Sequence, residues 1–306
     1  MFKPILIGLL SSSFLIPAFA NSEEALTTDN KVRAIVILDN PQTLTDLVDS
    51  SILERVNPLP NAEKPESTPS GPLATEDTGT PGKHGIEVNV IGNCDRSRNG
   101  RSCESVVGVA YGIRDNIELS FEKSAFRETG FGEANFSGAG QTEIGMKYRF
   151  FDKKGFSMAI APSYSFNDAS KRRDEDGNIE KGEGSSVYIP LIISKEMGAY
   201  TTVANIGYRR NLQNRSQDSI ITSLAVGRSI NETNRVMAEV YSERDTHMGN
   251  VRTDVRVGWV KLVFPDKLKN FETSVYTSVA RTLGHTEDGR PHTTVNFGIS
   301  IARKAH

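Results

Sequence analysis

The stretch that decides the fold is VRTDVRVGW, residues 251–259, in which apolar and polar side chains alternate. In an extended chain one face would carry Val251, Thr253, Val255, Val257 and Trp259, and the other Arg252, Asp254, Arg256 and Gly258. A shift of one residue would turn three charges toward the apolar side, so the pattern fixes which face meets an apolar environment. The stretch therefore predicts a strand that crosses a membrane.

The same alternation recurs from His84 to Arg303, in segments of about ten residues that turn residues separate. The clearest segments lie around Leu119, Met146 and Phe297. We count twelve segments, within a range of roughly ten to fourteen. They begin near Ile86, Ser105, Asn116, Gln141, Phe156, Ser185, Ala199, Asp218, Asn234, Asn250, Asn270 and Thr293. The pattern predicts an all-β fold, an antiparallel transmembrane β-barrel over residues 83–306.

The connections between these segments alternate in length. Odd-numbered connections are long and polar, whereas even-numbered ones, such as residues 113–116 and 152–155, are short. Barrels of bacterial outer membranes have this arrangement, with long loops outside the cell and short turns in the periplasm. An even number of strands also places both ends of the barrel on the periplasmic side. A soluble β-sandwich, the alternative, would bury the apolar face and would not sort its loops by length.

The first twenty residues have the three parts of a secretory signal peptide. Lys3 supplies the single cation, residues 4–19 form the apolar run, and Ala18 and Ala20 form the small-residue exit. Cleavage is expected after Ala20. No later stretch reaches the roughly 18 uninterrupted apolar residues that a membrane helix needs. The sequence thus favours export to the outer membrane of a Gram-negative cell.

Residues 21–82 differ from the rest and are expected to form a mostly irregular periplasmic extension. From Asn57 to Gly82 the chain is rich in Pro, Glu, Ser, Thr and Gly and lacks apolar periodicity, which is typical of a linker. Before it, Thr43 and Asp46 are spaced as a capping box for a short helix with an apolar stripe. That helix could enter a barrel lumen as a plug, but a partly ordered extension is the simpler interpretation.

The only two cysteines, Cys94 and Cys103, bracket a polar run in a chain that is expected to be exported. In an oxidising compartment such a pair predicts a disulfide that closes the loop between them. A metal site is the weaker interpretation, because no histidine cluster accompanies the cysteines.

Three passages carry a resemblance to a known family: LATEDTGTPGKHGIEVNV from Leu73, VAYGIRDNIELSF from Val109 and SGAGQTEIGMKYRFF from Ser137. In them the chain resembles a family of outer-membrane β-barrels described as transporters linked to the meta-pathway of phenol degradation, over about residues 73–306. The resemblance implies a barrel and an uptake role. The chain departs from the usual barrel pattern at its end, because no terminal aromatic residue follows Ala302 and Phe297 lies inside the last segment.

Charged side chains on the polar strand faces are the candidates for lining a lumen. They could border a solute path, or they could pair across the lumen and fill it. Side chains fill the interior of small barrels, and an open aqueous channel becomes clear at about sixteen strands, so a barrel of twelve strands leaves both outcomes open. The candidates are Glu118, Glu122, Glu143, Lys147, Arg149, Glu239, Arg252, Asp254, Arg256 and Glu272. We expect a transporter or channel for a small solute, hydrophobic and aromatic solutes included. The alternative is a structural barrel that anchors its loops or its amino-terminal segment to a partner without transport.

No pattern indicates an enzyme. The near pairs of histidine and carboxylate are His285 with Glu287 and His247 with Asp245, from which a Ser-His-acid lipid hydrolase would have to be built. The acidic loop from Asp174 lacks the final glutamate of a calcium loop. There is also no phosphate loop, zinc spacing or nucleotide fingerprint. We therefore expect no catalytic residue, no metal and no cofactor.

The expected partners are outer-membrane lipid and lipopolysaccharide, the barrel-assembly machinery and a small-molecule solute. The formal net charge is -2 and 24% of the residues are charged, so the chain has no basic field that would attract nucleic acid.

Overall fold

The computed structural model describes residues 73–97, 100–129, 136–166, 172–173, 179–180, 184–213, 215–247, 249, 251–263, 271–283 and 292–303. The expected signal peptide and the expected helix after residue 43 lie outside these residues. Within them, no helix is long and apolar enough to cross a membrane.

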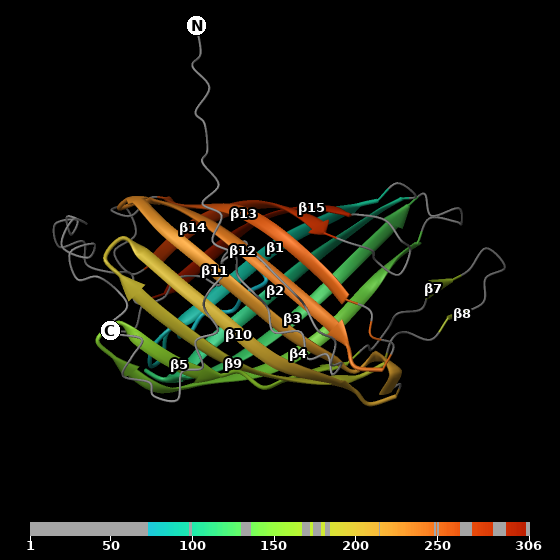
Figure 1. Ribbon diagram of the computed structural model, residues 1–306, viewed down its shortest axis with the longest axis horizontal. Helices are drawn as coiled ribbons and strands as arrows, with labels where there is room; N and C mark the ends of the chain where they lie inside the picture. Colours follow the sequence, from blue (N-terminus) through green and yellow to red (C-terminus); the bar gives the residue numbers. More distant parts are fainter. Residues whose placement is uncertain are drawn as a thin grey trace, which may run out of the picture. The chain divides into compact units, whose positions relative to one another are not determined.

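Twelve antiparallel strands close into one barrel, as the sequence predicts (Figure 1). Along most of the wall each strand pairs with the next one in the chain, and β15 pairs with β1 to close the circle. Thirteen segments make up the twelve strands, because β5 and β6 share one position: β1 (Ile86–Arg96), β2 (Arg101–Arg114), β3 (Ile117–Thr129), β4 (Phe136–Lys153), β5 (Phe156–Ile160), β6 (Ser163–Phe166), β9 (Ser186–Met197), β10 (Tyr200–Asn211), β11 (Ser219–Asn231), β12 (Asn234–Asp245), β13 (Val251–Val263), β14 (Phe271–Leu283) and β15 (Thr293–Arg303). The connections hold the short pair β7 (Arg172–Arg173) and β8 (Ile179–Glu180) and the 3-10 helix η1 (Arg215–Gln217).

Strands β5 and β6 both lie between β4 and β9, so together they form one strand of the wall. The interruption falls at Pro162, which has no N–H to donate to a neighbouring strand. The wall stays closed there, because the N–H of Met146 donates to the carbonyl of Pro162 (3.0 Å) and that of Ala161 to the carbonyl of Pro190 (3.3 Å).

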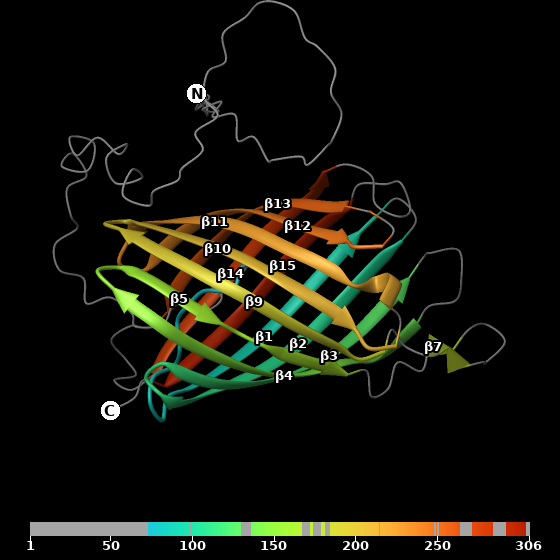
Figure 2. The ribbon, with the colours of Figure 1, turned by 60° about the horizontal axis from the view of Figure 1, so that its bottom comes forward.

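The short connections lie at one rim of the barrel, which we call the short-turn rim. Between β4 and β5, Lys154 and Gly155 have φ angles of 52° and 70°, the positive values that a two-residue type I′ hairpin requires. β1 begins and β15 ends at this same rim, where Ile86 pairs with Arg303. The β7–β8 pair projects beyond the opposite end (Figures 1 and 2).

Two strands begin earlier than the sequence indicates. β2 begins at Arg101 rather than near Ser105, and β4 at Phe136 rather than near Gln141. The backbone ladder continues through these polar stretches with a regular β1–β2 register. Apolar alternation marks a strand only where one face meets lipid, so it misses the part of a strand that extends beyond a bilayer.

The outer surface of the barrel is a belt of exposed apolar side chains. Every strand of the wall contributes at least one, with an exposed fraction between 41% and 61%: Val90, Val107, Phe121, Ile144, Tyr164, Ile189, Ile206, Leu224, Val240, Val257, Val279 and Phe297. Asp254, between two outward-facing residues of the stretch at 251–259, is only 3% exposed. A continuous apolar belt around a closed sheet suits contact with lipid.

Candidate functional site in the barrel lumen

The inner face of the wall carries polar and charged side chains at the positions that alternate with the belt. Four of the residues singled out from the sequence are buried there: Glu118, Lys147, Glu239 and Asp254. Glu143 and Arg256 are partly buried, whereas Glu122 and Arg252 are more open. Glu272 and Arg149 lie near the short-turn rim, where Arg149 donates to the carbonyl of Asp115 (2.9 Å).

The wall formed by β2, β3 and β4 is acidic on its inner face. It carries Glu104, Glu118, Glu122 and Glu143, and Glu122 lies directly opposite Glu143 in the β3–β4 ladder. Like charges in such a position repel each other. The hydroxyl of Ser165 donates to Glu143 (2.5 Å), which eases only part of that repulsion.

The wall formed by β10 to β13 carries arginines that are paired with carboxylates. The pairs are Arg209 Nη1 with Glu243 Oε1 (2.8 Å), Arg252 Nη2 with Asp254 Oδ2 (3.0 Å) and Arg256 Nη1 with Glu239 Oε2 (3.6 Å). Only the Arg256–Glu239 pair is buried on both sides, so loss of either partner there would leave an uncompensated buried charge, whereas Arg209 and Arg252 are partly exposed.

Residues 73–82, which we call the lumen segment, lie inside the barrel (Figure 2). Glu239 on β12 accepts hydrogen bonds from the backbone N–H of Ala74 (3.1 Å) and from both the backbone N–H and the hydroxyl of Thr75. The sequence assigned these residues to the end of a linker, because they lack apolar periodicity. They are ordered by hydrogen bonds to a polar wall, and such contacts leave no periodic apolar pattern.

The lumen segment also contacts the opposite wall. Lys147 on β4 donates to the carbonyl of Gly79 (3.2 Å), and its Nζ lies 3.5 Å from Oε1 of Glu76. The hydroxyls of Thr78 and Ser157 are 2.6 Å apart. The segment thus links β12 to β4 and β5 across the barrel interior.

The backbone passes very close to β2 where the lumen segment turns into β1. A Cβ atom added to Gly112 would lie 1.7 Å from the carbonyl oxygen of Gly82, so no side chain fits there. The N–H of His84 donates to the carbonyl of Gly112 (2.7 Å), and that of Gly112 to the carbonyl of Gly85 (3.0 Å). This close approach anchors the end of the lumen segment at the short-turn rim.

Two carboxyl groups of the lumen segment have perturbed acidity. Burial raises the pKa of Glu76, against the opposing attraction of Lys147. Burial also raises the pKa of Asp77, whose Oδ1 accepts a hydrogen bond from the N–H of Gly79 (2.9 Å). Both groups therefore bind protons more readily in the lumen than they would in water.

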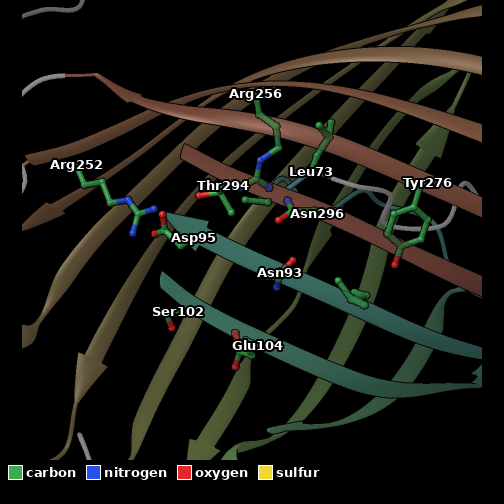
Figure 3. A pocket seen from close by; sticks show the side chains of 12 residues that line it. Leu73, Asn93, Asp95, Ser102, Glu104, Arg252, Arg256, Tyr276, Thr294 and Asn296 are labelled. Atoms are coloured by element: carbon green, nitrogen blue, oxygen red, sulfur yellow. The ribbon is translucent and has the colours of Figure 1, made fainter. Parts of the chain in front are cut away.

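A cavity of about 420 Å³ lies in the lumen beside Leu73 and Ala74 of the lumen segment (Figure 3). Its other lining residues come from β1, β2, β13, β14 and β15. The charged ones are Asp95, Glu104, Arg252 and Arg256. A cavity of this size can hold a small organic molecule. Sequence reasoning found the two arginines but missed Asp95 and Glu104, which lie in stretches that read as loop.

The lumen face also has an apolar part that the sequence did not reveal. Ala159 on β5, Ile192 on β9, Val203 on β10 and Ala161 in the break after β5 form a buried cluster. The signal in the sequence is the run of residues 187–193, which is apolar on both faces rather than on alternate ones.

Cys94 and Cys103 form the expected disulfide. They lie directly opposite each other in the β1–β2 ladder, with Cα atoms 4.1 Å apart. The bond ties the two strands together beside Asp95 and Ser102, which line the cavity.

The ring of His247 does not meet Asp245, the carboxylate that the sequence pairs with it. The ring of His247 lies 3.2 Å from the hydroxyl of Thr246, and Asp245 accepts a hydrogen bond from the backbone N–H of His247, not from its ring. His285 and Glu287 lie outside the described residues. In the described ranges, no group of three or more His, Cys, Asp or Glu residues is placed to hold a metal ion.

Comparison with protein-family models and with curated proteins gives no match. Among solved structures, an outer-membrane channel from Pseudomonas putida F1 matches with a TM-score of 0.55 and 11% identity, covering 78% of this chain and 99% of that chain. The KdgM porin matches with a TM-score of 0.47 and 10% identity over 72% of this chain and all (100%) of that one. The NanC porin matches with a TM-score of 0.49 and 10% identity over 70% of this chain and 98% of that one. The first likeness shows a shared barrel fold.

Proposed function

We propose that this chain is an outer-membrane channel or transporter that passes a small solute through a lumen partly filled by residues 73–82. The observation that carries the proposal is the cavity of about 420 Å³ inside a closed barrel whose outer surface is apolar and whose inner surface is charged. The fold shared with an outer-membrane channel supports it.

The proposal includes an orientation. The short-turn rim, with the start of β1 and the end of β15, faces the periplasm, and the longer connections face the outside of the cell. The apolar belt then contacts outer-membrane lipid, with lipopolysaccharide on the outer side, and the barrel-assembly machinery inserts the chain.

The nature of the solute is a finer part of the proposal. Resemblance to barrels linked to phenol degradation favours an aromatic solute. The cavity, however, has one aromatic ring, that of Tyr276, among its described lining residues, together with four charged side chains. The lining therefore offers more to a polar or charged solute than to a hydrophobic one.

A structural barrel without transport is the second candidate. The lumen segment favours it, because Glu239 and Lys147 hold residues 74–79 across the interior. A segment that never leaves the lumen would make the barrel an anchor for the residues that precede it.

The test is to isolate outer membranes, compare boiled and unboiled protein on a denaturing gel, and record ion conductance of the folded protein in planar bilayers. A channel predicts a compact, heat-modifiable species with discrete conductance steps. A heat-modifiable protein without conductance, even after substitution of Glu239, would support the structural barrel. Recovery from the soluble periplasm without a mobility shift would overturn both.

A further inference from the structure

Four exposed arginines lie close together at the rim opposite the short-turn rim, on strands that the long connections join. We call them the arginine patch: Arg96 at the end of β1, Arg101 at the start of β2, Arg127 near the end of β3 and Arg281 near the end of β14. Strands β14, β15, β1, β2 and β3 are consecutive neighbours in the wall (Figure 2). The patch therefore occupies one side of the barrel.

The alternation along each strand turns these side chains away from the lumen. Asp95 and Ser102 line the cavity, so the adjacent residues Arg96 and Arg101 point to the outer face. Arg281 lies between two residues of β14 that are at most 3% exposed, whereas its own side chain is exposed. The patch thus belongs to the outer surface and is separate from the lumen site.

The β-ladders bring three of the arginines together. Arg96 lies directly opposite Arg101 in the β1–β2 ladder. Arg127 pairs with Cys103, two residues along β2 from Arg101, so Arg127 lies diagonally across from Arg101. Cβ atoms are about 5 Å apart in directly opposite pairs and about 7–8 Å apart in diagonal ones. Flexible arginine side chains at these spacings can reach one common anion.

The fourth arginine lies on the same row of the sheet. Arg281 and Arg96 both have Thr293 of β15 as their ladder partner, one from each side. At about 4.8 Å per strand, the backbones of Arg281 and Arg96 are roughly 10 Å apart. The guanidinium of Arg281 donates to the hydroxyl of Thr293, which lies between the two arginines.

The patch has no carboxylate partner in the part of the chain that the structure describes. Arg96 and Arg127 make neither a hydrogen bond nor an ion pair there. Arg101 donates from Nε to Sγ of Cys103 (3.2 Å) and from Nη2 to Sγ of Cys94 (3.5 Å), so the disulfide positions its guanidinium. Like charges directly opposite each other in a ladder are destabilising, and an anion between them would remove that cost.

The height of the patch fits the edge of a bilayer. Ile86, at the other end of β1, is an exposed apolar residue at the short-turn rim. The ten positions from Ile86 to Arg96, at about 3.3 Å each along a strand tilted by about 40°, cover roughly 25 Å in height. The apolar band of an outer-membrane barrel is about as tall. Arg96 therefore lies at the level of lipid headgroups when Ile86 lies at the opposite edge of the band.

We propose that the arginine patch binds lipopolysaccharide through a phosphate group of lipid A, its membrane anchor. The proposal rests on the orientation given with the proposed function, which turns this rim toward the outside of the cell, and it deepens that function by naming a lipid partner. Guanidinium groups bind phosphate through paired N–H donors, and the phosphate charge offsets the repulsion between Arg96 and Arg101. The acyl chains of the same molecule can then lie on the apolar belt below the patch.

The test measures lipid binding to the folded full chain in detergent by native mass spectrometry. The probes are bisphosphorylated lipid A, the same lipid after enzymatic removal of its phosphates, and phosphatidylglycerol. We expect lipid A to bind at least tenfold more tightly than its dephosphorylated form, the effect of one charged hydrogen bond or more, and added salt to reduce that difference. Equal affinity for the two forms would overturn the proposal. Equal affinity for phosphatidylglycerol would overturn the assignment to lipopolysaccharide in favour of anionic phospholipid.

Variants locate the site. Arg127→Gln removes a guanidinium that has no partner among the described residues, so the barrel should fold normally and bind lipid A roughly fivefold more weakly, the effect of one surface ion pair. The double variant with Arg96→Gln should weaken binding further. Arg303→Gln, at an exposed arginine on the short-turn rim, is the matched control and should keep full affinity. A loss in the control but not in the patch variants would overturn the site.

The patch and the channel can fail separately. Preferential binding of lipid A by a barrel that shows no conductance would refute the channel alone. A conducting barrel that does not distinguish lipid A from its dephosphorylated form would refute the patch alone.

Discussion

Glu239 on β12 accepts hydrogen bonds from both the backbone N–H and the side-chain hydroxyl of Thr75, a residue that lies 164 positions earlier in the chain. The same carboxylate receives the N–H of Ala74 and lies 3.6 Å from Arg256, which lines the cavity. One side chain therefore joins the lumen segment, the barrel wall and the cavity. If the lumen segment limits the passage of solutes, this contact should control how often the lumen is open.

Glu239→Gln should increase the open probability of the channel. The amide is a weaker acceptor than the carboxylate, and a hydrogen bond to a charged group contributes about 1.5–3 kcal/mol, so the released population should rise roughly tenfold or more. Single-channel recording measures this directly. Glu232→Gln should leave the open probability unchanged, and an unchanged value for Glu239→Gln as well would show that the segment does not gate the lumen.

Raising the pH should also release the lumen segment. Burial raises the pKa of Glu76 and of Asp77, so the docked segment binds more protons than the released one. Docking is therefore strongest below the ordinary carboxyl pKa of about 4, and weakens as pH rises through the raised values. Lys147 faces both carboxyls and opposes the shift, while Asp77 and Glu143 add to it at Glu76. The open probability, recorded between about pH 4 and pH 7, should increase with pH.

The variant Glu76→Gln with Asp77→Asn tests whether these two groups cause the effect. It should flatten the pH dependence, because neither side chain titrates. A pH dependence of the same size in the variant would assign it to other lumen carboxylates.

The outer face of the barrel was predictable from residue identities alone, because a membrane imposes a rule on every second residue. At Val257, with 61% exposure, and at Asp254, with 3%, the face follows from the alternation in the sequence. The ends of β2 and β4 were not predictable, because polar residues beyond the bilayer carry no such rule. The wall around Pro162 also depends on a hydrogen bond donated by β4 and on another accepted by β9, which the local sequence does not show.

The lumen site was predictable only in part. The charges of β13 stand out because they alternate with apolar residues, and Arg252 and Arg256 do line the cavity. Thr75 and Gly79 do not stand out, because their partners Glu239 and Lys147 are distant in sequence and the contacts are hydrogen bonds, which leave no periodic pattern in the sequence. A composition rich in Thr, Gly and Pro is shared by free linkers and by segments that fill a polar lumen.

Val257→Arg should destabilise the folded barrel. Val257 lies in the middle of β13 and faces outward, where an arginine at the bilayer midplane costs about 2–4 kcal/mol. The heat-modifiable fraction and the urea midpoint in lipid vesicles should both fall. Glu122→Arg introduces the same side chain on the open lumen face and should fold normally. Equal loss of folding in the two variants would mean that the outer face does not contact lipid.

Phe297 on β15 lies directly opposite Gly92 on β1, and its ring covers the glycine. A Cβ at Gly92 would lie 2.4 Å from the ring Cζ, so Gly92→Ala should displace the ring and destabilise the β1–β15 closure by about 1–3 kcal/mol. Gly227→Ala is the control, because its nearest neighbour would be at 3.5 Å. Unfolding in urea measures both.

The double variant with Phe297→Leu separates the clash from the loss of the glycine itself. Once the Phe297 ring is removed, Gly92→Ala should reduce the free energy of unfolding much less, because substitutions of residues in contact have non-additive effects on stability. Gly92 and Phe297 lie on β1 and β15, the two strands whose pairing closes the barrel, so the same experiment reports on the stability of that closure. Additive effects, or a Gly92→Ala variant as stable as Gly227→Ala, would show that the ring does not pack on the glycine in the membrane.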